Sequence, residues 1–123
     1  MRMLLPPLKL RREVREFLSE FFQTHHEPTF NNAVRLLCRF YNLPIPNIEW
    51  YETLDWGKTA GLTYEDGNIQ LIHPENWKRN TKYNTEAQWI KSVLHEFGHF
   101  MLWSDPETKA DLFSVRMMRS VTP

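Results

Sequence analysis

The segment His95-Glu96-Phe97-Gly98-His99 constrains the fold of this 123-residue chain more than any other feature of its sequence. It lies in a run, residues 85–103, whose apolar side chains recur at helical spacing: Ile90, Val93, Leu94, Phe97 and Met101. Thr85 and Gln88 form the pattern of a capping box at the start of this run. The sequence therefore predicts one helix that carries two histidines a single turn apart on the same face.

This arrangement is typical of a zinc site. Two imidazoles four residues apart can reach the same tetrahedral ion, and Glu96 lies to one side of them on the helix. From there a carboxylate can take a proton from a metal-bound water without itself binding the metal. His95 and His99 are therefore candidate metal ligands, and Glu96 is a candidate general base.

The third ligand has to come from the residues after His99, which include no further histidine. Asp105-Pro106 has the pattern of an N-cap followed by proline at the first helical position, so it predicts a final helix. Because the connection is short, the two helices should run antiparallel, with Glu107 level with His99 and Asp111 level with His95. We expect Glu107 to complete the zinc shell and Asp111 to hold the His95 ring through its free N–H.

Asp105 is an alternative third ligand. It lies six residues after His99, where the metzincin pattern HExxHxxGxxH has its third ligand. That pattern needs a glycine at the position of Leu102, and leucine does not easily adopt the left-handed conformation of such a turn. The sequence favours Glu107 and leaves open both Asp105 and a helix without a metal.

Together, the two predicted helices resemble the gluzincin metallopeptidases, in which HExxH is followed by a helix carrying ExxxD. The segment ETKADLFS, residues 107–114, is similar to the ExxA(D/N)xFA segment of the ImmA/IrrE group of small zinc peptidases. GLTYEDGNIQLIHP, residues 61–74, resembles the β-hairpin of that group. The resemblance is close over residues 90–114, loose over 60–89 and absent before them. Ser114, where alanine is usual, and the short interval before Glu107 depart from the pattern.

The resemblance implies a zinc-dependent endopeptidase with a zincin-like fold, a cleft bordered by the hairpin edge, and protein or peptide substrates. His73, at the end of the hairpin, is a candidate donor to the oxyanion. The alternative is a metal-binding regulatory or interaction protein in which a zincin-like fold has no catalytic role. Gly98 costs about 1 kcal/mol in the middle of a helix, so it indicates the close approach of a strand or a substrate.

The remaining pattern predicts one α+β domain over residues 1–123, with N-terminal helices, a short antiparallel sheet and a C-terminal active-site helical hairpin. The helix at about 32–42 should begin after a break at Pro28 and Asn31-Asn32. Asp66-Gly67 favours a tight two-residue hairpin turn. The predicted elements are helices at about 8–23, 32–42, 85–103 and 106–119, strands at 47–52, 60–65 and 68–73, and a polar loop at 74–83.

The composition limits the classes of function. Lysine plus arginine equals aspartate plus glutamate, 15 each, so the chain has no overall field that attracts nucleic acid or an anionic membrane. The basic residues at positions 9, 11, 12 and 15 are interleaved with Glu13, Glu16 and Glu20 and predict the solvated face of a helix. No apolar run reaches the length of a membrane span, so we expect no membrane partner. The single cysteine, Cys38, fits a small core residue of a cytoplasmic protein.

Overall fold

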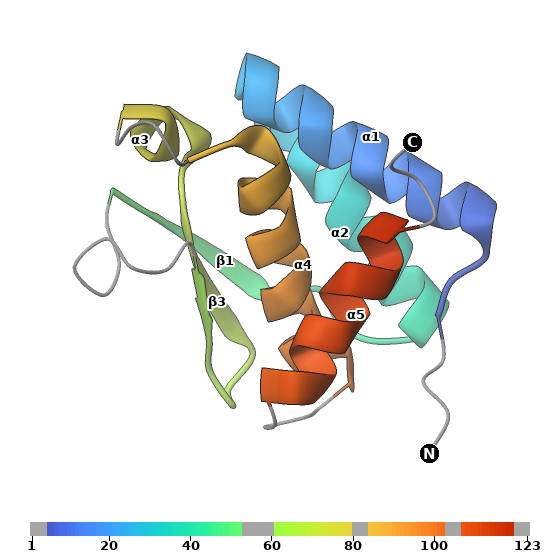
Figure 1. The fold of residues 1–123 in the computed structure, drawn as a ribbon. Helices are drawn as coiled ribbons and strands as arrows, with labels where there is room; N and C mark the ends of the chain where they lie inside the picture. The colour runs from blue at the N-terminus through green and yellow to red at the C-terminus, as the bar shows by residue number, and fades with distance from the viewer. Residues whose placement is uncertain (1–4, 53–60, 80–83, 103–106, 120–123) are drawn as a thin grey trace.

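The computed structural model describes residues 5–52, 61–79, 84–102 and 107–119. These ranges fold into a mixed α+β arrangement, which confirms the α+β class, while the zincin-like fold stays a prediction (Figure 1). In chain order the elements are α1 (Leu8–Thr24), α2 (Glu27–Tyr41), β1 (Asn47–Tyr51), β2 (Gly61–Thr63), β3 (Asn68–Ile72), α3 (Pro74–Arg79), α4 (Glu86–Leu102) and α5 (Glu107–Arg119). Within the described residues, no helix is both long enough and apolar enough to cross a membrane.

The sheet has the strand order β1-β3-β2 and is mixed. Strand β2 pairs antiparallel with β3, as the hairpin predicts, but β1 pairs parallel with β3. The prediction of a wholly antiparallel sheet was therefore wrong for β1. A tight turn fixes the relative direction of the two strands it joins, whereas no local residue fixes the direction of a strand that pairs across a longer connection.

The hairpin turn is longer than the predicted two residues. The Gly67 N–H donates to the Tyr64 carbonyl at 3.1 Å, and the Tyr64 N–H donates to the Asn68 carbonyl at 2.9 Å. Gly67 has φ +91°, a conformation that glycine adopts without strain. This turn with a glycine bulge keeps Ile69 and Leu71 fully buried on the helix-facing side of the sheet.

Two predicted boundaries near prolines were wrong. Helix α2 begins at Glu27, so Pro28 lies in its first turn, where a missing N–H costs nothing, and does not break the chain before it. The predicted loop at 74–83 contains α3, which begins at Pro74. The His73 carbonyl accepts hydrogen bonds from the N–H groups of Asn76 and Trp77, both at 3.0 Å.

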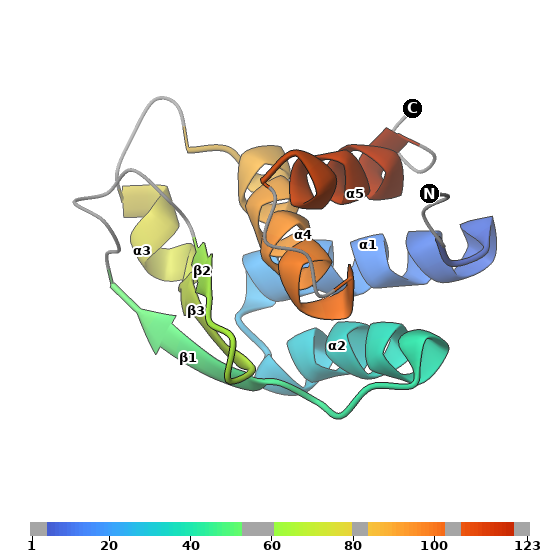
Figure 2. The same ribbon diagram turned by 90° about the horizontal axis from the view of Figure 1, so that it is seen from below.

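Helix α4 lies at the centre of the molecule, between the sheet and the other long helices (Figure 2). Its capping box is confirmed, because the Thr85 hydroxyl accepts from the Gln88 N–H at 3.2 Å and the Gln88 side chain accepts from the Thr85 N–H at 3.4 Å. The fully buried Trp89 donates its indole N–H to the Ile72 carbonyl at 2.8 Å, which ties α4 to β3. Cys38 is buried in the same core, and burial raises the pKa of its thiol to about 11, as suits a packing residue.

The close approach at Gly98 comes from α5. A Cβ atom at position 98 would lie 3.1 Å from Cα of Ala110, 3.2 Å from its carbonyl oxygen and 3.1 Å from Cδ1 of Phe113. Helix α5 runs back obliquely across α4 and contacts it there (Figure 1). The expectation of a strand or a substrate at this position was therefore wrong, and Gly98 sets the distance between two helices.

We predict that Gly98→Ala lowers the free energy of unfolding by about 1 kcal/mol. Overpacking costs about 1–3 kcal/mol and outweighs the gain of about 1 kcal/mol in helix propensity, because two of the three close atoms belong to the Ala110 backbone. Urea unfolding measures the change. Lys91→Ala, on the exposed side of the same helix, is the control and should stay within about 0.5 kcal/mol. A stabilised Gly98→Ala would show that α5 can move aside.

Candidate metal centre

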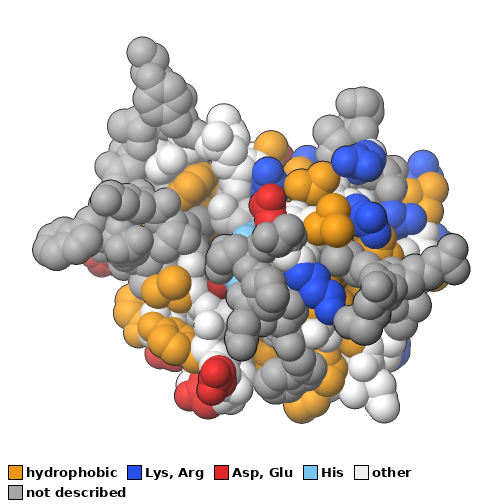
Figure 3. Space-filling model, turned by 60° about the horizontal axis from the view of Figure 1, so that its bottom comes forward, with side chains coloured by type: hydrophobic (Ala, Val, Ile, Leu, Met, Phe, Trp, Pro, Cys, Tyr) orange, Lys and Arg blue, Asp and Glu red, His pale blue; other side chains and the backbone are white. Residues whose placement is uncertain are grey.

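Helix α4 brings His95 and His99 together on one face. The centroids of their rings are 4.9 Å apart and the ring planes are inclined by 80°. Zinc–nitrogen bonds of about 2.0–2.1 Å and tetrahedral angles place two imidazoles on one ion with ring centres about 5 Å apart. The observed spacing therefore fits two ligands of a single zinc ion. On the face shown in Figure 3, histidine atoms reach the surface close to acidic side chains.

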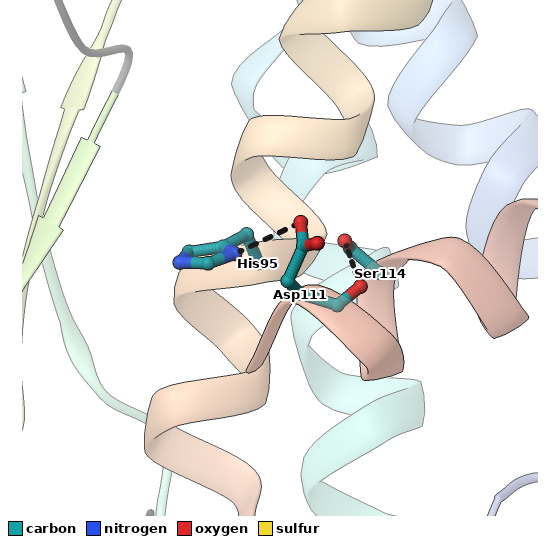
Figure 4. Close-up of polar contacts among 3 residues, drawn as sticks. All are labelled: His95, Asp111 and Ser114. Carbon is teal, nitrogen blue, oxygen red and sulfur yellow. Dashed lines mark hydrogen bonds and ion pairs between the residues drawn. The ribbon is translucent and has the colours of Figure 1, made fainter. Parts of the chain in front are cut away.

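Asp111 of α5 lies beside His95. Its Oδ1 is 3.8 Å from Nδ1 of His95, longer than a hydrogen bond but within range of an ion pair. Figure 4 shows that the second ring nitrogen of His95 points away from Asp111. A carboxylate at Nδ1 favours the tautomer with its proton there, which leaves Nε2 with the lone pair that a metal needs.

Ser114 stands where the ImmA/IrrE segment usually has alanine, and it is fully buried close to Asp111. Its hydroxyl donates to the Asp111 carbonyl at 2.8 Å, one turn earlier in α5 (Figure 4). The buried hydroxyl therefore finds its partner within the helix and leaves the Asp111 carboxylate to His95. The substitution is compatible with the arrangement around His95.

Glu96 is almost completely buried, with 7% of its surface exposed, and it faces β2. The hydroxyl oxygen of Thr63 lies 2.7 Å from Oε1 of Glu96 and 3.1 Å from its main-chain carbonyl oxygen. A Cβ at Gly61 would come within 2.8 Å of Cγ of Glu96, so the strand touches the side chain directly. Sequence reasoning missed Thr63, although a polar residue at an inward strand position, two residues from an inward glycine, is a signal for such a contact.

The third ligand remains a prediction. Glu107 is the first residue of α5, one turn before Asp111, but its side chain lies outside the described residues. Asp105 lies outside them as well. Because Glu107 and Asp111 are four residues apart in α5, they lie on the same face of that helix.

His73 lies in a different neighbourhood from His95 and Glu96. The Ile72 carbonyl next to it accepts from Trp89, which lies two turns, about 10 Å, before Glu96 along α4. Nδ1 of His73 accepts the Glu75 N–H at 3.1 Å, so the ring caps α3. The structure therefore does not bring His73 together with the α4 histidines, and its role as oxyanion donor stays a prediction.

Within the described part of the chain, His25, His73 and Glu75 form a cluster whose potential ligand atoms lie within 4.8 Å of one another. Two of the nitrogen lone pairs have partners already. Nδ1 of His73 accepts from Glu75, and Nε2 of His25 lies 3.3 Å from the Lys78 ammonium, which can only donate. A metal here would have to displace both contacts and would meet the charge of Lys78, so we interpret the cluster as a cap that joins α1 to α3.

Comparison of the chain with protein-family models, with curated proteins and with solved structures finds no match. The inferences below therefore rest on the geometry of the site and the chemistry of its residues.

We predict that the free energy of unfolding falls as the pH drops below about 6.5, in part through His73. Burial, then the neighbouring His25, lowers the pKa of His73 in the folded protein, while the unfolded chain binds the proton near pH 6.5. Stability from this group is therefore complete above that pH and is lost progressively as the pH falls toward the folded pKa.

Urea unfolding between about pH 5 and pH 8 measures this dependence, with His73→Asn as the comparison. Asparagine can cap α3 without titrating, so the variant should show a shallower loss of stability at low pH than the wild type. Identical pH dependences in the two proteins would contradict the assignment to His73.

Proposed function

We propose that this chain is a zinc-dependent metallopeptidase that hydrolyses peptide bonds in protein or peptide substrates. One observation carries the proposal. A buried carboxylate, Glu96, follows directly after one of two imidazoles spaced for a single zinc ion, and a strand holds it in place. A structural zinc site gains nothing from a carboxylate kept beside it, whereas metal-assisted hydrolysis requires one.

His95, His99 and Glu107 would hold the zinc ion, and Asp111 would orient the His95 ring. When bound, zinc supplies a lowered pKa for water and polarises the substrate carbonyl. The donor set fits this metal, because two imidazoles and one carboxylate leave a fourth position for water in a catalytic site.

Glu96 acts as the general base and then as the general acid. Its carboxylate takes a proton from the attacking water and delivers that proton to the amine that leaves when the peptide bond breaks. Burial favours this role, because a carboxylate away from bulk water interacts more strongly with the charges that develop around it.

The substrate would bind along β2, which is an edge strand of the three-stranded sheet. Tyr64 is hydrogen-bonded to Asn68, so the alternation of an antiparallel ladder turns the N–H and C=O of Thr63 away from β3. An extended peptide that pairs with these groups would run beside Glu96. This mode of binding supplies affinity through the main chain and admits varied side chains.

We predict that Glu96→Gln keeps zinc and loses hydrolysis. The amide preserves the shape of the side chain and can still accept from Thr63, but it cannot take a proton from water. Hydrolysis of casein and of quenched fluorescent peptides should fall by about 10²–10⁴-fold, with zinc per chain unchanged in the same samples.

Glu16→Gln, an exposed position on α1, is the matched control and should behave as the wild type. A Glu96→Gln variant that hydrolyses as fast as the wild type would overturn the mechanism. Zinc retained by a wild type that hydrolyses none of these probes would favour the regulatory alternative.

A further inference from the structure

Thr63 has two faces with different surroundings. Its side chain points toward α4, on the same side of the sheet as the buried Ile69 and Leu71. Its main-chain N–H and C=O point along the sheet, away from β3, because its pair with Ile69 is the non-hydrogen-bonded one. Thr63 therefore contacts α4 through its side chain and presents its main chain at the edge of the sheet that the described residues form.

The contact with α4 is specific in its chemistry. A threonine hydroxyl has one proton to donate, and two oxygens of Glu96 lie within reach, the carboxylate at 2.7 Å and the main-chain carbonyl at 3.1 Å. The contact with Oε1 is the shorter of the two, so the proton goes to the carboxylate. This bond restrains rotation of the carboxylate about its last torsion angle, which is otherwise soft.

Another residue of β2, Gly61, packs closely against the same side chain. Gly61 is the next inward position on β2, and even a methyl group there would lie 2.8 Å from Cγ of Glu96 and 2.8 Å from Cδ2 of Leu71. The Glu96 side chain therefore packs at Cγ against Gly61 and is hydrogen-bonded at Oε1 to Thr63. Two residues of the three-residue strand β2 therefore contact this one side chain.

We propose that Thr63 is a positioning residue that aligns the general base with the bound peptide. Its hydroxyl orients the Glu96 carboxylate, while its main chain pairs with the extended substrate. The same residue therefore sets the position of the general base relative to the scissile peptide bond. The proposal rests on the proposed peptidase function and adds the residue that couples its base to its substrate strand.

The test is Thr63→Val beside Thr63→Ser. Valine keeps the shape and the main-chain groups but removes the hydroxyl, and serine keeps the hydroxyl. With the quenched fluorescent peptides, Thr63→Val should lose about tenfold to a hundredfold in kcat with KM and zinc content unchanged, because misplacement of a catalytic group costs up to about a hundredfold. Thr63→Ser should recover to within a few-fold of the wild type.

An unchanged kcat in Thr63→Val would overturn the proposal, and so would a serine variant as slow as the valine variant. Crystal structures of the two variants give a readout that needs no activity. The Glu96 carboxylate should leave its position against β2 in Thr63→Val and keep it in Thr63→Ser. If the wild type hydrolyses nothing, the peptidase function fails, while a Glu96 that stays in place in Thr63→Val refutes the role of Thr63 independently.

Discussion

The rest of the site depends on the backbone contact between Gly98 of α4 and Ala110 of α5. The two helices approach closely there, since a single Cβ on Gly98 would press on the Ala110 backbone and on the Phe113 ring. Ala110 is followed directly by Asp111, so the same close approach brings the Asp111 carboxylate to 3.8 Å from Nδ1 of His95. A larger residue at 98 would strengthen the helix locally but separate the carboxylate from the histidine that it orients.

The candidate centre is supported from both sides of α4. Helix α5 supplies Asp111 to one histidine, and the edge strand β2 supplies Thr63 to Glu96. The helix itself is tied to β3 through Trp89, so the elements around the site are anchored to one core. Catalytic groups need their neighbours to fix their orientation, and here these neighbours belong to elements far apart in the sequence.

The sequence predicts the parts of the fold that local chemistry controls. The capping box at Thr85 and the helical period after it hold in the structure, and so does the α+β class. The start of α2 and the helix α3 were missed because Pro28 and Pro74 begin helices as readily as they end them. The parallel pairing of β1 and the contact of Thr63 with Glu96 arise from tertiary structure, which short strands do not encode on their own. Glu107 as third ligand remains a prediction.

Zinc per chain, measured after dialysis against a mild chelator, tests the central claim most directly, with wild type, Glu107→Ala and Asp105→Ala treated side by side. If His95, His99 and Glu107 hold the zinc ion, the wild type and Asp105→Ala should each retain about one zinc ion per chain. Glu107→Ala should lose most of its zinc, because only this variant removes a ligand. A wild type without zinc would contradict a metal centre on α4. Full retention in Glu107→Ala with loss in Asp105→Ala would transfer the third ligand to Asp105.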